Sequence, residues 1–119
     1  MSTEKSIRYN QGKPKWSLLD YNSLEPLVKV MEFGEKKYSR GNWQKGLELS
    51  EIQDSIYRHL NALNDGELCD KETGILHTGH IMANCMMWNY HFNKQHEEAK
   101  QEALQIILKG LGRRKCIVL

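Results

Sequence analysis

Apolar side chains recur every three or four residues through most of this chain, which is the spacing of one face of an α-helix. In the clearest stripe, Ile52, Ile56, Leu60 and Leu63 follow one another at this spacing. No stretch alternates apolar and polar residues convincingly with period two, so no strand is predicted. We therefore expect an all-α fold, a bundle of four or five helices. The pattern places helices at residues 23–38, 50–64, 76–96 and 95–109.

Capping residues indicate where the expected helices begin and end. Ser23 should cap the first helix, because a serine hydroxyl at this position accepts a hydrogen bond from a free backbone N–H. Ser50 and Gln53 have the spacing of a capping box at the start of the second helix. Asp65-Gly66 ends that helix, and Gly110 ends the last one.

The two ends of the chain lack a helical period. Residues 1–21 should form an extended or looped arm that packs through Trp16, Leu18 and Leu19. Residues 111–119 form a C-terminal tail whose last four residues formally match a prenylation box. We favour the alternative, an apolar tail that packs on the bundle or on a neighbouring subunit. The chain of 119 residues has room for a single helical domain that spans all of it.

Composition narrows the class of protein. Hydrophobic residues make up 39% and charged residues 27% of the chain, as in an ordinary soluble globular protein. A net charge of +2 is too small to predict nucleic acid binding. The chain has no apolar run of about 18 residues and no apolar signal core, so we expect a cytoplasmic protein with no membrane partner. The three cysteines are widely spaced and odd in number, which fits a reducing cytoplasm.

Side chains that can bind metal ions gather in the middle of the chain. His77, His80 and Asn84 fall on one face of the third expected helix, because they lie three and four residues apart. Two acidic residues, Glu67 and Asp70, precede this helix in a segment rich in turn residues. Imidazole and carboxylate groups together suit Zn²⁺, Mg²⁺, Mn²⁺ or Co²⁺.

His59 belongs to the same set, although it lies among the apolar residues of the second helix. A lone histidine on an apolar face is more often a satisfied core residue than a ligand. Glu67 should follow on the same face two turns later, which favours the ligand. The motif DxETGxxHxxH, from Asp70 to His80, completes the set. No HExxH motif or His-Asp dipeptide occurs, which argues against zincin and HD-phosphohydrolase sites.

A second, purely acidic set competes with the first. Glu32 and Glu35, followed by Glu51 and Asp54, match the ExxE…ExxD pattern of the all-α nucleotide pyrophosphohydrolases. Carboxylates at this spacing on two facing helices can hold Mg²⁺ ions that bridge phosphates. Glu51 and Asp54, however, should face solvent. Glu35 falls within the apolar stripe of its helix, unless the helix ends at Gly34 and frees the carboxylate to face water.

The segment between the first two helices suits a nucleotide. It contains Asn42 and Trp43 beside the cations Lys37 and Arg40, and such a loop can stack on a base and neutralise a triphosphate. Lys13, next to a proline in the N-terminal arm, could also contact phosphates. The alternatives are an ordinary connection with Trp43 packed in the core and a solvated basic loop around Lys13.

Three ordered blocks resemble the phage and bacterial family of dATP/dGTP diphosphohydrolases, a MazG-like branch of the all-α NTP pyrophosphohydrolases. The resemblance covers about residues 8–90. It implies Mg²⁺- or Mn²⁺-dependent cleavage of dGTP or dATP to dNMP and pyrophosphate, with two or more ions. It also implies a homodimer or homotetramer in an infected bacterial host. The blocks are RYNQGKPKWSLLD at residues 8–20, LEPLVKVMEFGEKKYSRGNW at residues 24–43 and DSIYRHLNALNDGELCDKETGILHTGHIMAN at residues 54–84.

The residue patterns and the resemblance together predict roles for individual side chains. Glu35, Glu67 and Asp70 are the expected catalytic residues, with Glu35 as a further metal ligand or a general base. The full set of expected metal ligands is Glu35, His59, Glu67, Asp70 and His80. The expected substrate-binding residues are Lys13, Lys37 and Arg40 for the phosphates, Asn42 and Trp43 for the base, and His77 and Asn84.

An alternative function uses the same residues for binding and involves no catalysis. A non-enzymatic helical phage protein could bind a nucleotide or a partner through the same face. Such a protein would bind without releasing pyrophosphate. The preference between dGTP and dATP stays open.

Overall fold

The computed structural model describes residues 4–110 of the chain. Within that range it contains four α-helices, three short 3-10 helices and no strand. The expected all-α class is therefore confirmed. The elements are η1 (Trp16–Leu18), η2 (Tyr21–Leu24), α1 (Glu25–Lys37), η3 (Asn42–Lys45), α2 (Leu49–Asn64), α3 (His77–Gln95) and α4 (Glu97–Lys109).

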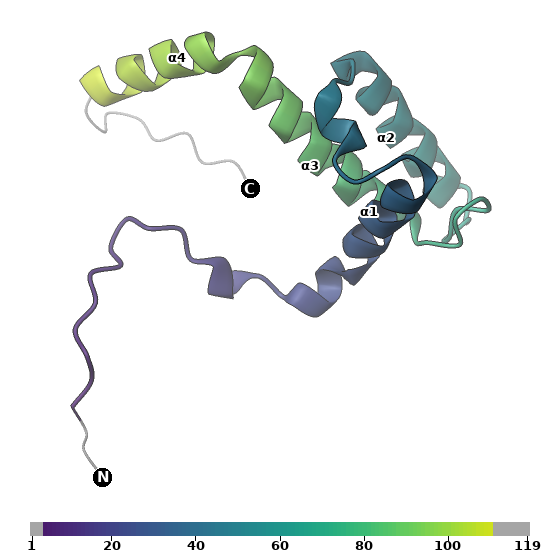
Figure 1. Ribbon diagram of the computed structural model, residues 1–119, viewed down its shortest axis with the longest axis horizontal. Coiled ribbons are helices and arrows are strands. Elements are labelled where there is room, and N and C mark those ends of the chain that lie inside the picture. The colour runs from purple at the N-terminus through teal and green to yellow at the C-terminus, as the bar shows by residue number, and fades with distance from the viewer. Residues whose placement is uncertain (1–3, 111–119) are drawn as a thin grey trace.

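Helix α3 is the central element of the fold. Helices α1 and α2 pack against it, mostly along its N-terminal half (Figure 1). Gly79 lies where α1 meets α3, and a Cβ atom at this position would come within 2.7 Å of the Pro26 side chain and 2.9 Å of its backbone. Only glycine therefore allows this close approach. We call α1, α2, α3 and the loops between them, residues 25–95, the three-helix unit.

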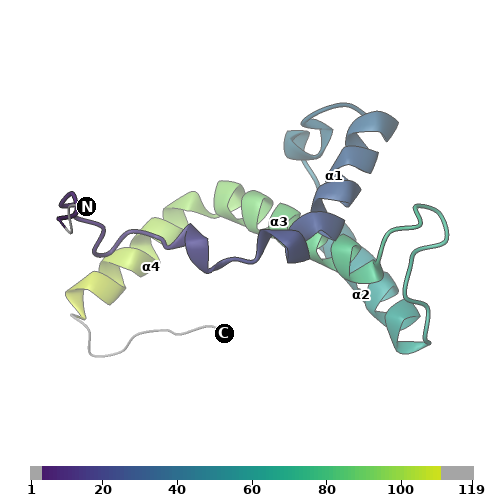
Figure 2. The same ribbon diagram turned by 90° about the horizontal axis from the view of Figure 1, so that it is seen from below.

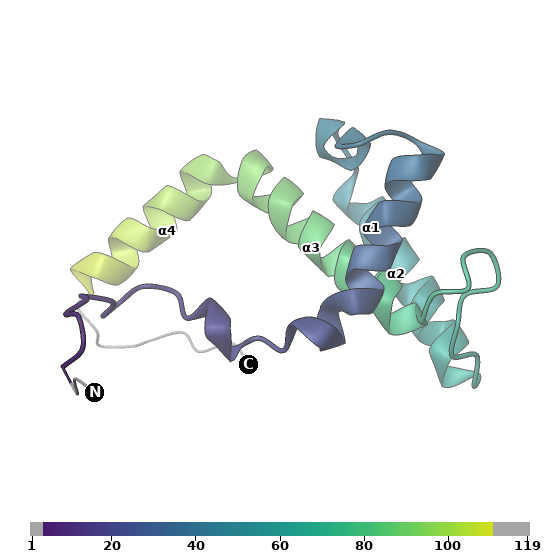
Figure 3. The ribbon, with the colours of Figure 1, turned by 60° about the horizontal axis from the view of Figure 1, so that its bottom comes forward.

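Helix α4 does not join this unit. It extends beyond the end of α3 and points away from α1 and α2 (Figures 2 and 3). Its apolar side chains find no covering element there and remain exposed. Three helices therefore pack together where four or five were expected. The exposed apolar residues of α4 are Leu104, Ile106, Ile107 and Leu108.

The observed helix boundaries agree with the expected ones to within two residues, but the caps differ. Ser23 does not cap α1, because it lies inside η2 and its hydroxyl donates to the Asp20 carboxylate. Ser50 does not cap α2, because the helix begins one residue earlier. Gln53 donates to the hydroxyl of Tyr57 and forms no capping box.

Polar side chains outnumber apolar ones among the buried residues of the described chain. The buried apolar residues are Ile52 and Ala83. Histidine and asparagine side chains are seldom enclosed unless they are hydrogen-bonded, so a cluster of them indicates a site rather than an ordinary core. The buried polar residues all lie on α3 and are His77, His80, Asn84 and His91.

The N-terminal arm leads away from the three-helix unit (Figure 1). Trp16 is 67% exposed, and Leu18 and Leu19 are also exposed. The expected packing through these three residues is therefore wrong, because the arm meets no apolar surface. The radius of gyration is 18.9 Å, well above the value for a compact domain. That value is about 13.5 Å for a chain of this length.

Other expectations concern the membrane and the thiols. No helix in residues 4–110 has the length and the apolar character needed to cross a membrane. Cys69 and Cys85 are free and exposed. The C-terminal tail, residues 111–119, lies outside the described residues together with its match to a prenylation box.

Candidate metal centre and nucleotide cleft

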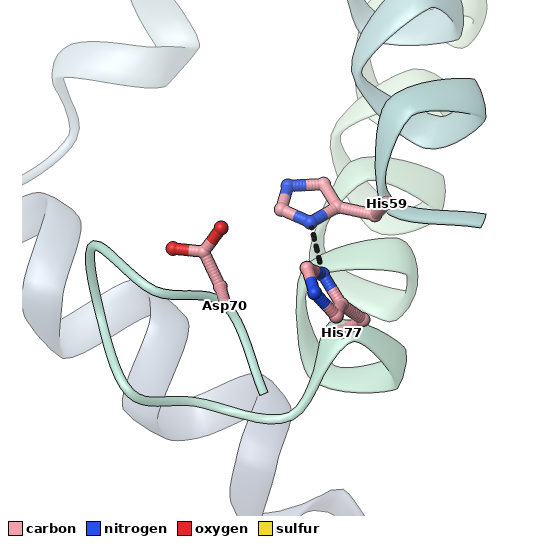
Figure 4. A group of neighbouring side chains, drawn as sticks. All are labelled: His59, Asp70 and His77. Carbon is pink, nitrogen blue, oxygen red and sulfur yellow. Dashed lines mark hydrogen bonds between the residues drawn. The ribbon is translucent and has the colours of Figure 1, made fainter. Parts of the chain in front are cut away.

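Three side chains from separate elements meet beside α3. His59 comes from α2, Asp70 from the loop that follows it, and His77 from the first turn of α3 (Figure 4). Each offers one ligand atom, and the three atoms all lie within 4.8 Å of one another. Two imidazoles and a carboxylate in such proximity form a donor set for a divalent metal ion. We call these three residues the two-histidine centre.

The two imidazoles of the centre face each other directly. His59 Nδ1 lies 2.8 Å from His77 Nδ1, so one nitrogen donates a proton and the other accepts it. The His59 ring also stacks on the His80 ring, with 4.4 Å between the centroids and 4° between the planes. The His59 ring is therefore held from two sides.

The loop that carries Asp70 also holds its carboxylate. Oδ2 accepts hydrogen bonds from the backbone N–H of Glu72 at 3.1 Å, the N–H of Thr73 at 3.0 Å and the Thr73 hydroxyl at 3.2 Å. Oδ1 receives none of these three bonds. Thr73 Oγ1 also lies 2.7 Å from His80 Nε2, which ties the loop to α3. Thr73 was not predicted from the sequence, although an aspartate that binds the backbone two and three residues ahead is a recognised turn pattern.

His77 is the most enclosed member of the centre, with 2% of its surface exposed. Its Nε2 atom has no hydrogen-bond partner among the described residues. Glu67 Oε1 lies 3.4 Å from this atom, within ion-pairing range but long for a hydrogen bond. Glu67 reaches this position from a loop, because α2 ends at Asn64 and the chain turns at Gly66, whose φ is +89°. The expectation that Glu67 continues the His59 face of a helix is wrong.

The protonation preferences of the site suit a metal ion. Burial lowers the pKa of His59, and the neighbouring His80 and His77 lower it further. Burial also lowers the pKa of His80, against the opposing effect of Asp70. For Asp70, burial by itself raises the pKa, but the hydrogen bonds from Thr73 outweigh it and the pKa falls below its ordinary value. Neutral imidazoles and an ionised carboxylate are the forms that bind metals.

The two-histidine centre lies in the wall of a cleft of about 1180 Å³ between α1, η3, α2, α3 and the loop before α3. A cleft of this size with convergent polar groups can accept a nucleoside triphosphate. Lys13 is the one expected site residue outside the lining, since it lies in the exposed arm. The expected site residues that line the cleft are Glu35, Lys37, Arg40, Asn42, Trp43, His59, Glu67, Asp70, His77, His80 and Asn84.

The acidic ExxE…ExxD set is divided by the fold. Glu32 and Glu35 line the cleft, whereas Glu51 and Asp54 are exposed on α2 and do not. Helix α1 continues through Gly34 to Lys37, and yet the Glu35 side chain remains about half exposed at the cleft. The four carboxylates therefore do not form one site in this chain.

Two of the cations that line the cleft, Lys37 and Arg40, are already paired with acids. Lys37 Nζ lies 3.0 Å from Glu72 Oε1, and this pair joins α1 to the loop before α3. The hydrogen bond and the charge of Glu72 raise the pKa of Lys37. Arg40 Nε lies 3.9 Å from Glu35 Oε2. A triphosphate that enters the cleft must compete with both carboxylates.

Two residues expected to bind substrate also support the fold. The Trp43 ring meets the His91 ring edge-on at 6.1 Å, and the Trp43 carbonyl accepts a hydrogen bond of 2.7 Å from His91 Nε2. The Asn84 amide donates to Ser55 Oγ at 3.1 Å and to the His80 carbonyl at 2.9 Å. These bonds anchor η3 and α2 to α3 while both side chains line the cleft.

Comparison with known proteins now decides the family. The family model described as "dATP/dGTP diphosphohydrolase, N-terminal" matches residues 3–102. The chain belongs to this family. A curated protein of Salmonella phage PMBT28, named dATP/dGTP diphosphohydrolase, is 38% identical over 80 residues, which are 67% of this chain and 27% of the phage protein. The chain thus spans about a quarter of the length of that relative. No solved structure matches.

Proposed function

We propose that this chain carries the catalytic unit of a metal-dependent nucleotide pyrophosphohydrolase. Its substrates are dGTP, dATP or both, and its products are dNMP and pyrophosphate. The observation that carries the proposal is the two-histidine centre, which lies in a cleft that also holds Lys37 and Arg40. Family membership and the name of the Salmonella phage relative support the class of substrate.

The donor set fits a divalent cation. His77 Nε2 is buried without a hydrogen-bond partner in the described chain, and an ionised carboxylate and a second imidazole lie close to the same ring. We propose Mg²⁺ or Mn²⁺, with two or more ions. A bound cation of this kind neutralises phosphate charge and lowers the pKa of a coordinated water. The proposed ligands are His59, Asp70 and His77, and Glu35, Glu67 and His80 line the same cleft.

The remaining residues bind the substrate and move a proton. Lys37 and Arg40 neutralise the triphosphate once its oxygens displace Glu72 and Glu35. Asn42, in η3, contacts the base. The freed Glu35 carboxylate accepts a proton from the attacking water, whose oxygen bonds to the α-phosphorus. The bond from that phosphorus to the oxygen bridging the α- and β-phosphates then breaks, and pyrophosphate leaves.

We also propose that the protein assembles as a homodimer or homotetramer in the cytoplasm of an infected bacterial host. The arm and α4 expose apolar side chains, while the described chain buries few of them. Monomeric proteins rarely leave large apolar patches exposed. Light scattering on the protein as it elutes from a size-exclusion column measures the mass of the assembly. A monomer at micromolar concentration would contradict the proposed assembly.

The activity is tested by incubating the purified chain with each dNTP and Mg²⁺ or Mn²⁺, followed by ion-exchange separation of the products. We expect a purine dNTP to yield dNMP and pyrophosphate. Asp70→Asn should lower turnover by about 1000-fold, roughly 4 kcal/mol on the barrier, because it removes a charged metal ligand. Asp54→Asn changes an exposed carboxylate of α2 outside the cleft and should keep full turnover.

Three outcomes would contradict the proposal. Release of intact triphosphate would identify a reaction of the HD-phosphohydrolase type. Binding of a dNTP without any product would identify the non-enzymatic nucleotide-binding protein. Full turnover by the Asp70→Asn protein would remove the two-histidine centre from the chemistry.

A further inference from the structure

We propose that the two-histidine centre is a transition-metal site. It binds Mn²⁺, Co²⁺ or Zn²⁺ in preference to Mg²⁺, through His59 Nδ1, His77 Nδ1 and the Asp70 carboxylate. Glu67 is a positioning residue in this assignment, because it accepts a hydrogen bond from His77 Nε2 and holds that ring in its metal-binding tautomer. The inference deepens the proposed function and rests on it for the use of the ion, whereas binding itself can be measured without a nucleotide.

The chemistry of the donor atoms separates these metals from Mg²⁺. Mg²⁺ prefers oxygen ligands and usually keeps several of its waters. Imidazole nitrogen suits the first-row transition metals and Zn²⁺, and affinities for a nitrogen-rich site rise from Mn²⁺ through Co²⁺. Two of the three donors at this centre are imidazoles. A site specific for Mg²⁺ would have carboxylates in place of His59 and His77.

The spacing of the two Nδ1 atoms also matches a shared ion. They lie 2.8 Å apart. Two nitrogens bound at about 2.1 Å to one ion lie about 3.0–3.4 Å apart at octahedral or tetrahedral angles. An ion can therefore replace the shared proton with little change in the distance between the two nitrogens, once the rings turn their lone pairs towards it. The Asp70 ligand atom, within 4.8 Å of both others, completes the set from the loop.

The partnerless Nε2 atom of His77 is explained by the same arrangement. If His77 carries the Nδ1 proton, its Nε2 lone pair points towards the Glu67 carboxylate at 3.4 Å, which places two acceptors together in a buried position. With a metal ion on both Nδ1 atoms, that proton moves to Nε2 of the same ring. His77 Nε2–H then donates to Glu67, and no proton is gained or lost overall. Such carboxylate–histidine–metal arrangements fix the tautomer of a metal-bound histidine.

Neighbouring groups hold the other two ligands in place. The His80 ring stacks on His59 at 4.4 Å and fixes its plane. Thr73 binds Asp70 Oδ2 through its N–H and its hydroxyl, so Oδ1 can turn to the ion. Thr73 also meets His80 Nε2, which joins the two supports into one network. Ligands oriented in this way by outer groups bind metal without a large ordering cost.

The test measures metal binding directly on the full, untagged chain after chelator treatment. Calorimetry should give one site for Co²⁺, with Mg²⁺ weaker by at least about 100-fold, and bound Co²⁺ should show visible absorption bands. Asp70→Asn and His59→Gln should each weaken Co²⁺ binding by at least about 100-fold, with helical circular dichroism unchanged. Asp54→Asn should bind as the parent does. Equal affinity for Mg²⁺ and Co²⁺, or parental Co²⁺ binding by both site variants, would overturn the assignment.

The role of Glu67 needs a readout of the tautomer. Glu67→Gln should weaken Zn²⁺ binding by about 10–100-fold. Long-range proton–nitrogen NMR of the Zn²⁺-loaded chain should place the His77 proton on Nε2. In the Glu67→Gln protein the signal of the Nε2 proton should shift, or this proton should exchange faster with water. If Glu67 only supported the local structure, the signal would stay in place. Direct coordination through His77 Nε2 would overturn this role and make Glu67 a ligand.

The two proposals fail in different ways. Tight Co²⁺ binding by the two-histidine centre without pyrophosphate release in any metal would overturn the hydrolase and leave the metal site intact. Pyrophosphate release with Mg²⁺ from a chain that does not bind Co²⁺ would overturn the transition-metal site and leave the hydrolase.

Discussion

The three-helix unit buries polar side chains, whereas the N-terminal arm and α4 leave apolar side chains exposed. His77, in the unit, is 2% exposed, whereas Trp16 in the arm is 67% exposed. The histidines can be enclosed because they bond to one another, to Thr73 and to nearby carboxylates. Burial among the described residues therefore favours polar side chains that bond to one another. We propose that another copy of the chain covers the apolar residues of the arm and α4.

The first prediction concerns the free energy of unfolding and compares two isoleucines, one buried and one exposed. Ile52 in α2 is 3% exposed and Ile106 in α4 is 71% exposed. Ile52→Ala should lower the free energy of unfolding by about 2–4 kcal/mol, because it leaves a cavity in a small core. Ile106→Ala should change it by less than about 0.5 kcal/mol in the monomer. Urea unfolding at several protein concentrations measures both.

The concentration dependence of the loss at Ile106 distinguishes two positions of α4. A loss at Ile106 as large as that at Ile52, independent of concentration, would mean that α4 is buried within its own chain. A loss at Ile106 that grows with protein concentration would place α4 in an interface between copies.

A second, smaller effect concerns the contact between α1 and α3. Gly79→Ala would place a Cβ atom within 2.9 Å of the Pro26 backbone, so α1 must shift. We expect a loss of about 1–3 kcal/mol from this overpacking. Gly34→Ala is the control, because a Cβ on this glycine of α1 meets nothing within 4 Å, and it should stabilise the helix by up to about 1 kcal/mol. Thermal unfolding distinguishes them, and equal stability of the two variants would contradict the close contact.

The enclosed histidines predict how the metal-free protein responds to acid. The pKa values of His59 and His80 lie below the ordinary value of 6.5 in the folded state, because burial penalises the charged rings. The unfolded chain therefore binds more protons below pH 6.5, and stability falls as the pH drops through that range. Asp70, whose pKa is lowered, stays ionised there. Melting temperatures measured with chelator from pH 8 to pH 5 test this. His80→Gln should flatten the dependence, and a melting temperature that rises on acidification would contradict it.

The periodic parts of this molecule could be predicted from sequence, and the helices occur within two residues of their expected positions. Apolar spacing is a local signal, so it does not depend on the partner of each helix. The same spacing does not reveal whether a partner exists. Trp16 and the α4 stripe were therefore expected to pack, and both are exposed. The caps at Ser23 and Ser50 were wrong because several nearby residues could begin each helix.

The composition of the site was predicted only in part, because His77 was expected to bind substrate and His80 to bind metal. Its internal geometry was not predicted. The sequence placed His59, Asp70 and His77 in one region because acids and histidines are dense there. The contact between His59 and His77 depends on how α2 meets α3, which no spacing within one helix reveals. Lys13 lies outside the cleft. Its position next to a proline does not predict the direction of the N-terminal arm, so the sequence could not show this. Thr73 was missed because its importance comes from the two groups it joins.

The smallest expected effect concerns the ion pair between Lys37 and Glu72. The two side chains are 46% and 68% exposed and their charged atoms lie 3.0 Å apart, so Glu72→Gln should lower stability by less than about 1 kcal/mol. The same change frees Lys37 for a phosphate oxygen and should lower KM by about 2–5-fold, since this pair is worth no more than that in competition. Glu25→Gln is the control, because it breaks an equally exposed pair with Lys29 on α1 outside the cleft.

The two variants compare an ion pair at the cleft with one outside it. Both should cost similar stability, because exposed ion pairs are weak wherever they occur. Only Glu72→Gln should change KM for the dNTP in steady-state kinetics. A higher KM in the Glu72→Gln protein would instead mean that Glu72 helps to bind the substrate, through an ion that the carboxylate and the phosphates share. Equal KM in both variants would mean that Lys37 does not contact the phosphates.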